Sequence, residues 1–184
     1  KFGTNSFIGP GYDFLFVQLK GITTEDDVMI GKNAWLQTTH DGQISIGEGT
    51  NIGRNAVITA QKSIQIGKYC LLSYNVSIYD HEHDYTNPQK PAMQSGTIKV
   101  KEVIIEDGCF IGAHSFIMPG VHLEKRCVVG ANSVVTKSFP AFSVIGGNPR
   151  FQPTHEPLHD IDTRGFCRPV LSGPPVHLTR VITA

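Results

Sequence analysis

Residues 105–135 read IEDGCFIGAHSFIMPGVHLEKRCVVGANSVV, and an aliphatic residue occupies every sixth position of this stretch. The same six-residue frame appears earlier in the chain, for example at Ile30, Ile46 and Ile66. The ten full hexads start at residues 30, 46, 52, 66, 72, 105, 111, 117, 123 and 129. Such a fixed period is typical of repeat architectures, in which each unit packs against its neighbours.

Two other hexad positions are also restricted. The second position is glycine in six of the ten hexads, at Gly31, Gly47, Gly53, Gly67, Gly112 and Gly130. The fifth position is always small or medium-sized, with Ala34, Thr50, Ala56, Cys70, Val76, Cys109, Ser115, Val121, Cys127 and Ser133. Each hexad therefore predicts a short strand with an inward aliphatic side chain, followed by a corner. Glycine suits a corner because it tolerates backbone angles that a Cβ atom forbids.

Three hexads make one coil of 18 residues, as from Ile105 to Leu123, and stacked coils pair as parallel strands about 4.8 Å apart. The coil from Ile46 to Ile66 carries a two-residue extension around Gln61 and Lys62. A helix would need apolar residues three and four apart, which this frame lacks. The sequence thus predicts an all-β fold, a parallel β-solenoid.

The frame divides the chain into segments. Residues 28–149 form the predicted solenoid, and residues 1–27 are expected to cap it or to begin it. The frame breaks once, at 79–102, which is too long for a corner and predicts an ejected loop of the kind that carries function. Residues 150–184 contain five prolines and no hexads, so an irregular tail is expected.

Composition excludes several classes of protein. Lys plus Arg and Asp plus Glu are equal at 16 each, so no overall charge attracts nucleic acid or an anionic membrane. No apolar run reaches the length of a membrane span, and the sequence does not begin with a signal-like segment. Three of the four cysteines, Cys70, Cys109 and Cys127, fall on the buried fifth position. They are interpreted as reduced core residues, which favours a cytoplasmic location.

Two stretches carry a family resemblance. Residues 76–88 read VSIYDHEHDYTNP, and residues 103–149 read VIIEDGCFIGAHSFIMPGVHLEKRCVVGANSVVTKSFPAFSVIGGNP. They resemble the hexapeptide-repeat acetyltransferases, specifically the branch that acetylates maltose, galactosides, nodulation factors and polysaccharides. The resemblance implies a left-handed parallel β-helix, a homotrimer and acetyl-CoA as co-substrate. It also implies a sugar hydroxyl as acceptor and no metal.

This chain departs from the family pattern in three places. Phe110 replaces a usual tryptophan, and Leu123-Glu124 replaces a usual Ile-Gly. After Pro149 the chain continues Arg150-Phe151-Gln152-Pro153, where the family usually has a small residue and then basic residues. The third departure affects the region where family members contact CoA.

Acetyl transfer needs a base beside the acceptor, and histidine suits this role because it is mostly neutral near pH 7. The loop offers His81 and His83. In the family the catalytic histidine stands five residues after the last inward aliphatic residue, and that count from Ile78 reaches His83, with His81 as the alternative. Asp80 or Asp84 could orient the imidazole.

The resemblance also implies binding residues. Asn55 matches an asparagine that contacts the acceptor sugar, although asparagine is equally favoured in turns. The pantetheine arm of CoA would lie along corners that contain Ala113 and Ala131. The remaining expected CoA contacts are Thr136, Lys137 and Arg150.

Other functions share this fold. A γ-type carbonic anhydrase would hold zinc through three histidines, and His81, His83, His114 and His122 lie in or near suitable coils. A streptogramin-type antibiotic acetyltransferase is a second alternative, and a non-enzymatic scaffold is a third. The ejected loop argues against a scaffold.

Overall fold

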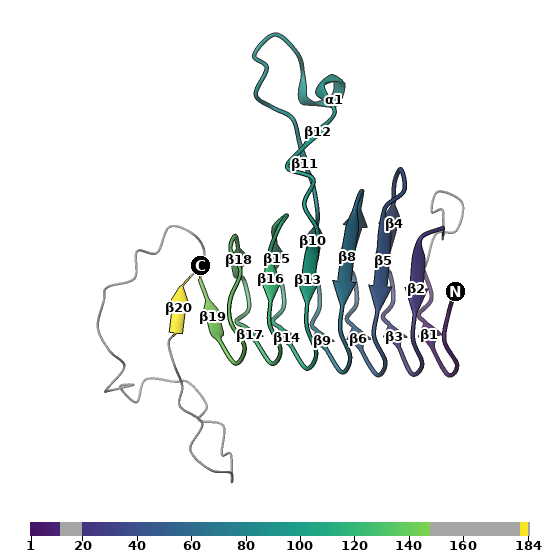
Figure 1. Cartoon of the computed structure of the whole chain (residues 1–184). Coiled ribbons are helices and arrows are strands. Elements are labelled where there is room, and N and C mark those ends of the chain that lie inside the picture. The colour runs from purple at the N-terminus through teal and green to yellow at the C-terminus, as the bar shows by residue number, and fades with distance from the viewer. Residues whose placement is uncertain (12–19, 148–180, 184) are drawn as a thin grey trace.

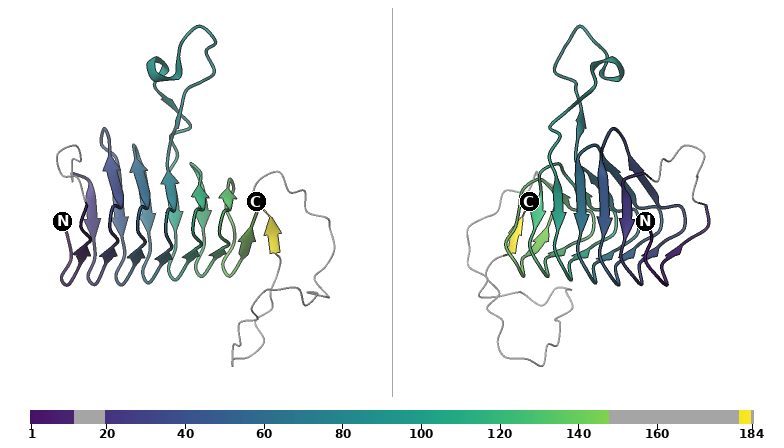
Figure 2. Two further views of the ribbon diagram at one scale, coloured as in Figure 1. Left: turned by 180° about the vertical axis from the view of Figure 1, so that it is seen from behind. Right: turned by 45° about the vertical axis from the view of Figure 1, so that its right-hand side comes forward.

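The computed structural model of the chain describes residues 1–11, 20–147 and 181–183. It is a solenoid with three parallel sheets along its sides (Figure 1). We call the sheets A, B and C. Each regular coil passes through them in the order B, A, C, and Figure 2 shows the coils stacked along one axis. The predicted all-β solenoid is therefore confirmed.

The strands are short, and their pairing follows the coils. Sheet A contains β1 (Phe7–Ile8), β3 (Met29–Ile30), β6 (Asn51–Ile52), β9 (Leu71–Leu72), β14 (Phe110–Ile111), β17 (Val128–Val129), β19 (Val144–Gly146) and β20 (Val181–Thr183). Sheet B contains β2 (Ile22–Thr24), β5 (Gln43–Ile46), β8 (Ser63–Ile66), β13 (Val103–Ile105) and β16 (His122–Leu123). Sheet C contains β4 (Trp35–Thr38), β7 (Val57–Ala60), β10 (Ser77–Tyr79), β15 (Phe116–Ile117) and β18 (Val134–Val135).

The core is built from the hexad frame. The first residue of all ten hexads is buried, and so is the fifth residue of all ten. Each fully buried aliphatic side chain contributes roughly 1.5–3 kcal/mol relative to an exposed one, so the column of aliphatic residues holds the coils together. The frame therefore predicted both inward columns correctly.

The physical reason given for the second-position glycines was wrong. None of them has a positive φ. Instead five of the six, all except Gly130, lie tightly against the next coil: a Cβ on Gly53 would lie 2.4 Å from the Ser73 carbonyl oxygen, and one on Gly112 would lie 2.5 Å from the Ala131 nitrogen. Glycine is needed there because the backbones of successive coils approach closely.

The left-handed backbone conformation belongs to the fourth position. All ten fourth residues have positive φ: Asn33, Gly49, Asn55, Tyr69, Asn75, Gly108, His114, Gly120, Arg126 and Asn132. Seven of these are asparagine or glycine, the residues that adopt this conformation at least cost.

The predicted loop leaves the solenoid between β10 and β13 and projects well beyond the coils (Figures 1 and 2). It contains an antiparallel pair, β11 (Glu82–His83) and β12 (Thr97–Ile98), and a single turn of helix, α1 (Ala92–Ser95). Within the described residues, no helix has the length and apolar character that a membrane span requires. In the segment expected to be irregular, residues 181–183 form β20, which pairs with β19.

Candidate functional site

A buried carboxylate stands at the root of the loop. Asp80 follows β10 directly, and its side chain is 0% exposed. It accepts hydrogen bonds from the backbone N–H groups of Gln61 (2.9 Å), Lys62 (2.7 Å) and Ser63 (2.9 Å) in the preceding coil. The extension at Gln61 and Lys62 leaves these amides without strand partners on this side, and Asp80 satisfies them. A buried acceptor with several donors is held firmly in place.

Asp80 also positions a histidine. The Nδ1 atom of His81 lies 2.8 Å from Oδ1 of Asp80, and the His81 side chain is 14% exposed. Because a carboxylate only accepts hydrogen bonds, Nδ1–H donates, and in the neutral imidazole Nε2 is then the acceptor. The Tyr79 ring meets the imidazole edge-on at 6.4 Å and itself stacks on Phe116 at 5.0 Å. This arrangement presents an oriented imidazole that can accept a proton.

The second Asp/His pair of the loop is arranged differently. His83 lies in β11 and is exposed, and no hydrogen bond from its side chain to another described residue is present. Asp84 accepts hydrogen bonds from the Thr86 hydroxyl (2.7 Å) and the Thr86 N–H (2.8 Å). The hydroxyl and the amide of Thr86 lower the pKa of Asp84. Asp84 therefore shapes a local turn, and of the two candidate orienting residues only Asp80 contacts a histidine.

Asn55 takes part in a ladder of side chains. It lies between a sheet A strand and a sheet C strand, in a segment that we call the A/C corner. The ladder runs from Asn33 Nδ2 to Asn55 Oδ1 (3.4 Å) and from Asn55 Nδ2 to Asn75 Oδ1 (3.1 Å). Its last step joins Asn75 Nδ2 to His114 Nε2 (3.3 Å). Asn55 therefore has a structural role in its left-handed turn, and its exposed amide can still meet a ligand.

The expected CoA residues lie on both sides of sheet C in the last coils. Ala113 and Ala131 occupy adjacent rungs of the A/C corner, since the N–H of Asn132 donates to the Ala113 carbonyl at 2.8 Å. Thr136 and Lys137 follow β18 at the opposite end of sheet C, and the Lys137 ammonium lies 5.6 Å from the Phe139 ring centre. Arg150 lies outside the described residues.

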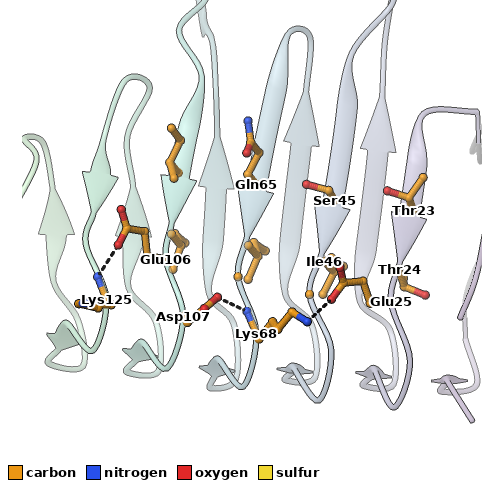
Figure 3. Close-up of a pocket in the computed structure, with 15 residues that line it drawn as sticks. Thr23, Thr24, Glu25, Ser45, Ile46, Gln65, Lys68, Glu106, Asp107 and Lys125 are labelled. Atoms are coloured by element: carbon orange, nitrogen blue, oxygen red, sulfur yellow. Dashed lines mark hydrogen bonds and ion pairs between the residues drawn. The ribbon is translucent and has the colours of Figure 1, made fainter. Parts of the chain in front are cut away.

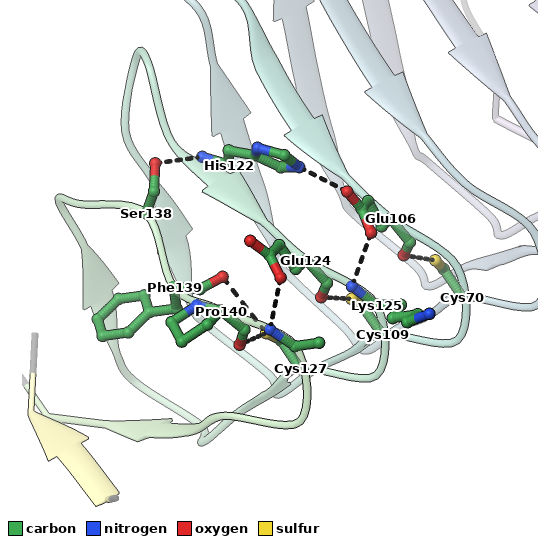
Figure 4. A network of polar contacts seen from close by, with 11 residues as sticks. Cys70, Glu106, Cys109, His122, Glu124, Lys125, Cys127, Ser138, Phe139 and Pro140 are labelled. Carbon is green, nitrogen blue, oxygen red and sulfur yellow. Dashed lines mark hydrogen bonds and ion pairs between the residues drawn. The ribbon is translucent and has the colours of Figure 1, made fainter. Parts of the chain in front are cut away.

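The histidines considered as zinc ligands lie in separate places. His81 binds Asp80, His114 ends the amide ladder, and His122 Nε2 lies 2.8 Å from a Glu106 carboxylate oxygen on the outer face of sheet B (Figure 4). Across residues 1–11, 20–147 and 181–183, no three side chains from His, Cys, Asp and Glu come together as metal ligands.

A groove of about 500 Å³ follows the outer face of sheet B, away from the loop (Figure 3). Its floor carries Thr23, Ser45 and Gln65, and its rim carries the Lys68–Glu25 ion pair at 3.4 Å. None of the residues predicted from the sequence as catalytic or ligand-binding lines it. The groove therefore lies apart from the Asp80–His81 pair, and we base the site on the pair.

Sequence reasoning missed the anchoring of the loop. The two-residue extension at Gln61 and Lys62 was recognised, but not its connection to Asp80. A further contact, from the Thr97 hydroxyl to Gln61 Oε1 at 2.8 Å, ties the returning arm of the loop to the same corner. The sequence feature that could have indicated the anchoring is a corner lengthened by two residues, whose backbone amides need acceptors, one coil before an aspartate.

Comparison with known proteins agrees with this architecture. The hexapeptide repeat of succinyl-transferase matches residues 43–80 and 102–137. A putative acetyltransferase of Dictyostelium discoideum is 32% identical over 137 residues, which cover 72% of this chain and 70% of that protein. A putative colanic acid biosynthesis acetyltransferase of Escherichia coli is 30% identical over 124 residues, and the match spans 65% of each chain.

A solved structure is similar as well. The hexapeptide-repeat acetyltransferase of Vibrio cholerae is 31% identical, with a TM-score of 0.54, and the match covers 65% of this chain and 69% of that one. The same Vibrio protein has also been crystallised with acetyl coenzyme A.

Proposed function

Because this chain belongs to the hexapeptide-repeat acetyltransferase family, we propose that it transfers the acetyl group of acetyl-CoA to a hydroxyl of a sugar or polysaccharide precursor. The colanic acid relative supports a saccharide acceptor, and the Vibrio structure with acetyl coenzyme A supports the donor. The observation that carries the proposal is the Asp80–His81 pair at the root of the loop.

We assign the general base to His81. Counting along the family pattern favoured His83, but the oriented histidine is His81, which has a buried carboxylate on Nδ1 and a lone pair on Nε2. The acceptor hydroxyl gives its proton to Nε2 of His81, and its oxygen forms a bond to the thioester carbonyl carbon. The C–S bond then breaks, and the imidazolium returns the proton to the departing sulfur. No covalent intermediate on the protein is needed.

Asp80 acts as the positioning residue. Three backbone amides fix its carboxylate, so the imidazole is held in one tautomer and one orientation before substrate arrives. The negative charge beside Nδ1 also stabilises the imidazolium that forms during transfer.

We further propose a homotrimer, with CoA bound along Ala113 and Ala131 between subunits, in a reducing cytoplasm. Small residues on adjacent rungs of one corner let an extended arm approach the backbone. The unpaired buried thiols Cys70, Cys109 and Cys127 fit a reducing compartment. Light scattering of the purified protein should give three times the chain mass, and a monomer at micromolar concentration contradicts this part of the proposal.

The test of the activity is an acetyl-CoA turnover assay that detects the free thiol of CoA. The panel should contain neutral sugars, sugar nucleotides, a streptogramin antibiotic and a no-acceptor control. Acceptor-dependent thiol release with a sugar or sugar nucleotide is expected. Release with the antibiotic alone favours the antibiotic acetyltransferase alternative. The absence of release with every acceptor contradicts the proposal.

A further inference from the structure

The A/C corner carries a column of exposed or half-buried side chains. The third residues of its hexads are Lys32, Arg54, Tyr74, Ala113 and Ala131. Backbone hydrogen bonds stack these residues in successive coils. In each coil the N–H of the fourth hexad residue donates to the carbonyl of the third hexad residue in the preceding coil. These bonds measure 3.0 Å to Lys32, 2.9 Å to Arg54 and 3.0 Å to Tyr74. The column therefore begins with two cations and an aromatic ring and ends with the two alanines.

No acidic residue accompanies these cations. Rungs 31–33, 53–55, 73–75, 112–114 and 130–132 contain no Asp or Glu. The equivalent segment between sheets B and A, the B/A corner, contains seven acidic residues in its rungs 25–27, 47–49, 67–69, 106–108 and 124–126. The two corners share the same backbone conformation, so they differ in the charge of their side chains.

One cation of the B/A corner has acidic partners that the cations of the A/C corner lack. Lys68 on the B/A corner forms ion pairs with Glu48 at 3.1 Å and Glu25 at 3.4 Å. Among the described residues, neither Lys32 nor Arg54 forms an ion pair. Two neighbouring cations without counter-ions repel each other and attract an anion.

Two further groups suit a phosphorylated ligand with a planar part. The Tyr74 side chain is 58% exposed, and an exposed aromatic face can stack on a nucleobase. The Asn33 and Asn55 amides stand beside the two cations and add hydrogen-bonding groups. Cations, amides and an aromatic ring in one column fit a nucleoside diphosphate better than a neutral sugar.

We propose that Lys32, Arg54 and Tyr74 bind the nucleoside diphosphate part of the acceptor, so that the acceptor is a nucleotide-linked sugar. This inference rests on the proposed transferase function. The coils after the loop, with Ala113 and Ala131, are assigned to CoA, and the coils before it remain for the acceptor. Within one chain this corner lies across sheet C from the loop root, so we assign the Asp80–His81 pair of a second copy in the proposed homotrimer to this acceptor.

The test is calorimetric titration of the full chain with uridine diphosphate and thymidine diphosphate, with acetyl-CoA present at saturation. Saturation keeps both probes out of the CoA site. At least one of them should bind the wild-type protein. Lys32→Ala and Arg54→Ala should each weaken that binding about tenfold, as expected for losing one charged hydrogen bond. Raising the salt concentration should weaken binding further.

Lys125→Ala is the matched control, because Lys125 occupies the same third hexad position on the B/A corner and is exposed. It should bind the probes as the wild type does, and all variants should keep the wild-type melting temperature. Equal weakening by Lys125→Ala, or no binding of either probe to the wild type, overturns the assignment. So does a loss of acetyl-CoA affinity in Arg54→Ala with unchanged diphosphate binding.

Tyr74→Ser tests recognition of the nucleoside. It should weaken binding of the nucleoside diphosphate that binds and leave binding of inorganic pyrophosphate unchanged. If pyrophosphate binds as tightly as the nucleoside diphosphates and Tyr74→Ser changes neither, the nucleoside is not recognised and the assignment is overturned. These measurements need no turnover, so failure of the transferase proposal would be seen separately in the thiol assay.

Discussion

The loop contains the same two residue types twice, as Asp80-His81 at its root and as His83-Asp84 three residues further on, and the structure treats them in opposite ways. Asp80 is buried against amides of the preceding coil and holds His81. The Asp84 carboxylate accepts hydrogen bonds from Thr86 instead, and His83 is exposed to solvent. The same two residue types therefore form a hydrogen-bonded Asp–His pair at the root of the loop and no such pair further along it.

The difference comes from distance to the solenoid. Residues at the root can still reach amides that the coil leaves unpaired, as Asp80 does at Lys62. Between β11 and β12 the loop has no coil to pack against. At its tip, α1 buries no residue and Met93 is 91% exposed. A catalytic group needs a fixed supporting shell, so only the root can provide one.

The largest expected effect separates the two histidines. His81→Ala should lower kcat by about 10²–10⁴-fold, because it removes the oriented base, while the KM for acetyl-CoA changes little. His83→Ala should cause only a small loss. The thiol-release assay measures both. A dead His83→Ala variant with an active His81→Ala variant would move the base to His83. Full activity in both would mean that the loop is not catalytic.

The next effect separates the two aspartates in stability. Asp80→Asn should destabilise the fold by about 2–4 kcal/mol, since the new amide group faces backbone donors inside the protein and leaves them poorly satisfied. Asp84→Asn, in the exposed turn, should leave the melting temperature almost unchanged. Thermal unfolding followed by circular dichroism compares them. Equal melting temperatures for the two variants would show that Asp80 is not the anchor of the loop.

Thiol labelling sharpens the contrast between coil and loop. Cys70, Cys109 and Cys127 are buried, and their thiols donate to carbonyl oxygens of the next coil, as from Cys70 to Glu106 at 3.2 Å (Figure 4). They should stay unlabelled until the protein unfolds. A Met93→Cys variant should gain one thiol that reacts at once. Mass spectrometry after a short exposure to reagent counts the labels, and rapid labelling of the three native cysteines contradicts the hexad frame.

The smallest effect is a pH dependence confined to the turn at Asp84. Its pKa is lowered from the ordinary 3.8 by the Thr86 hydrogen bonds, so these bonds favour the ionised carboxylate. The turn should be intact above that ordinary value and should loosen as the pH falls through the lower folded-state pKa. Amide exchange at Thr86, corrected for intrinsic pH dependence, measures this. Thr86→Val, which lacks the hydroxyl, should loosen at a higher pH than the wild type.

The sequence by itself determined the solenoid, its buried columns and the position of the loop. A period of six leaves one arrangement in which all ten aliphatic residues and all ten fifth residues are buried, as observed. Hydrophobic burial is the largest favourable contribution to folding, so a regular pattern of it is enough to fix the coils. The loop was predicted for the same reason, because it is where the pattern stops.

The tertiary structure alone decided the details that depend on neighbouring coils. The second-position glycines proved to serve the close approach of coils, and the left-handed turns proved to lie at the fourth position. His81 rather than His83 gained a buried partner, and that partner is held by amides 17 to 19 residues away. A six-residue pattern records which side chains point inward. Hydrogen bonds between rungs, by contrast, join residues that are distant in sequence and exist only once the coils are stacked.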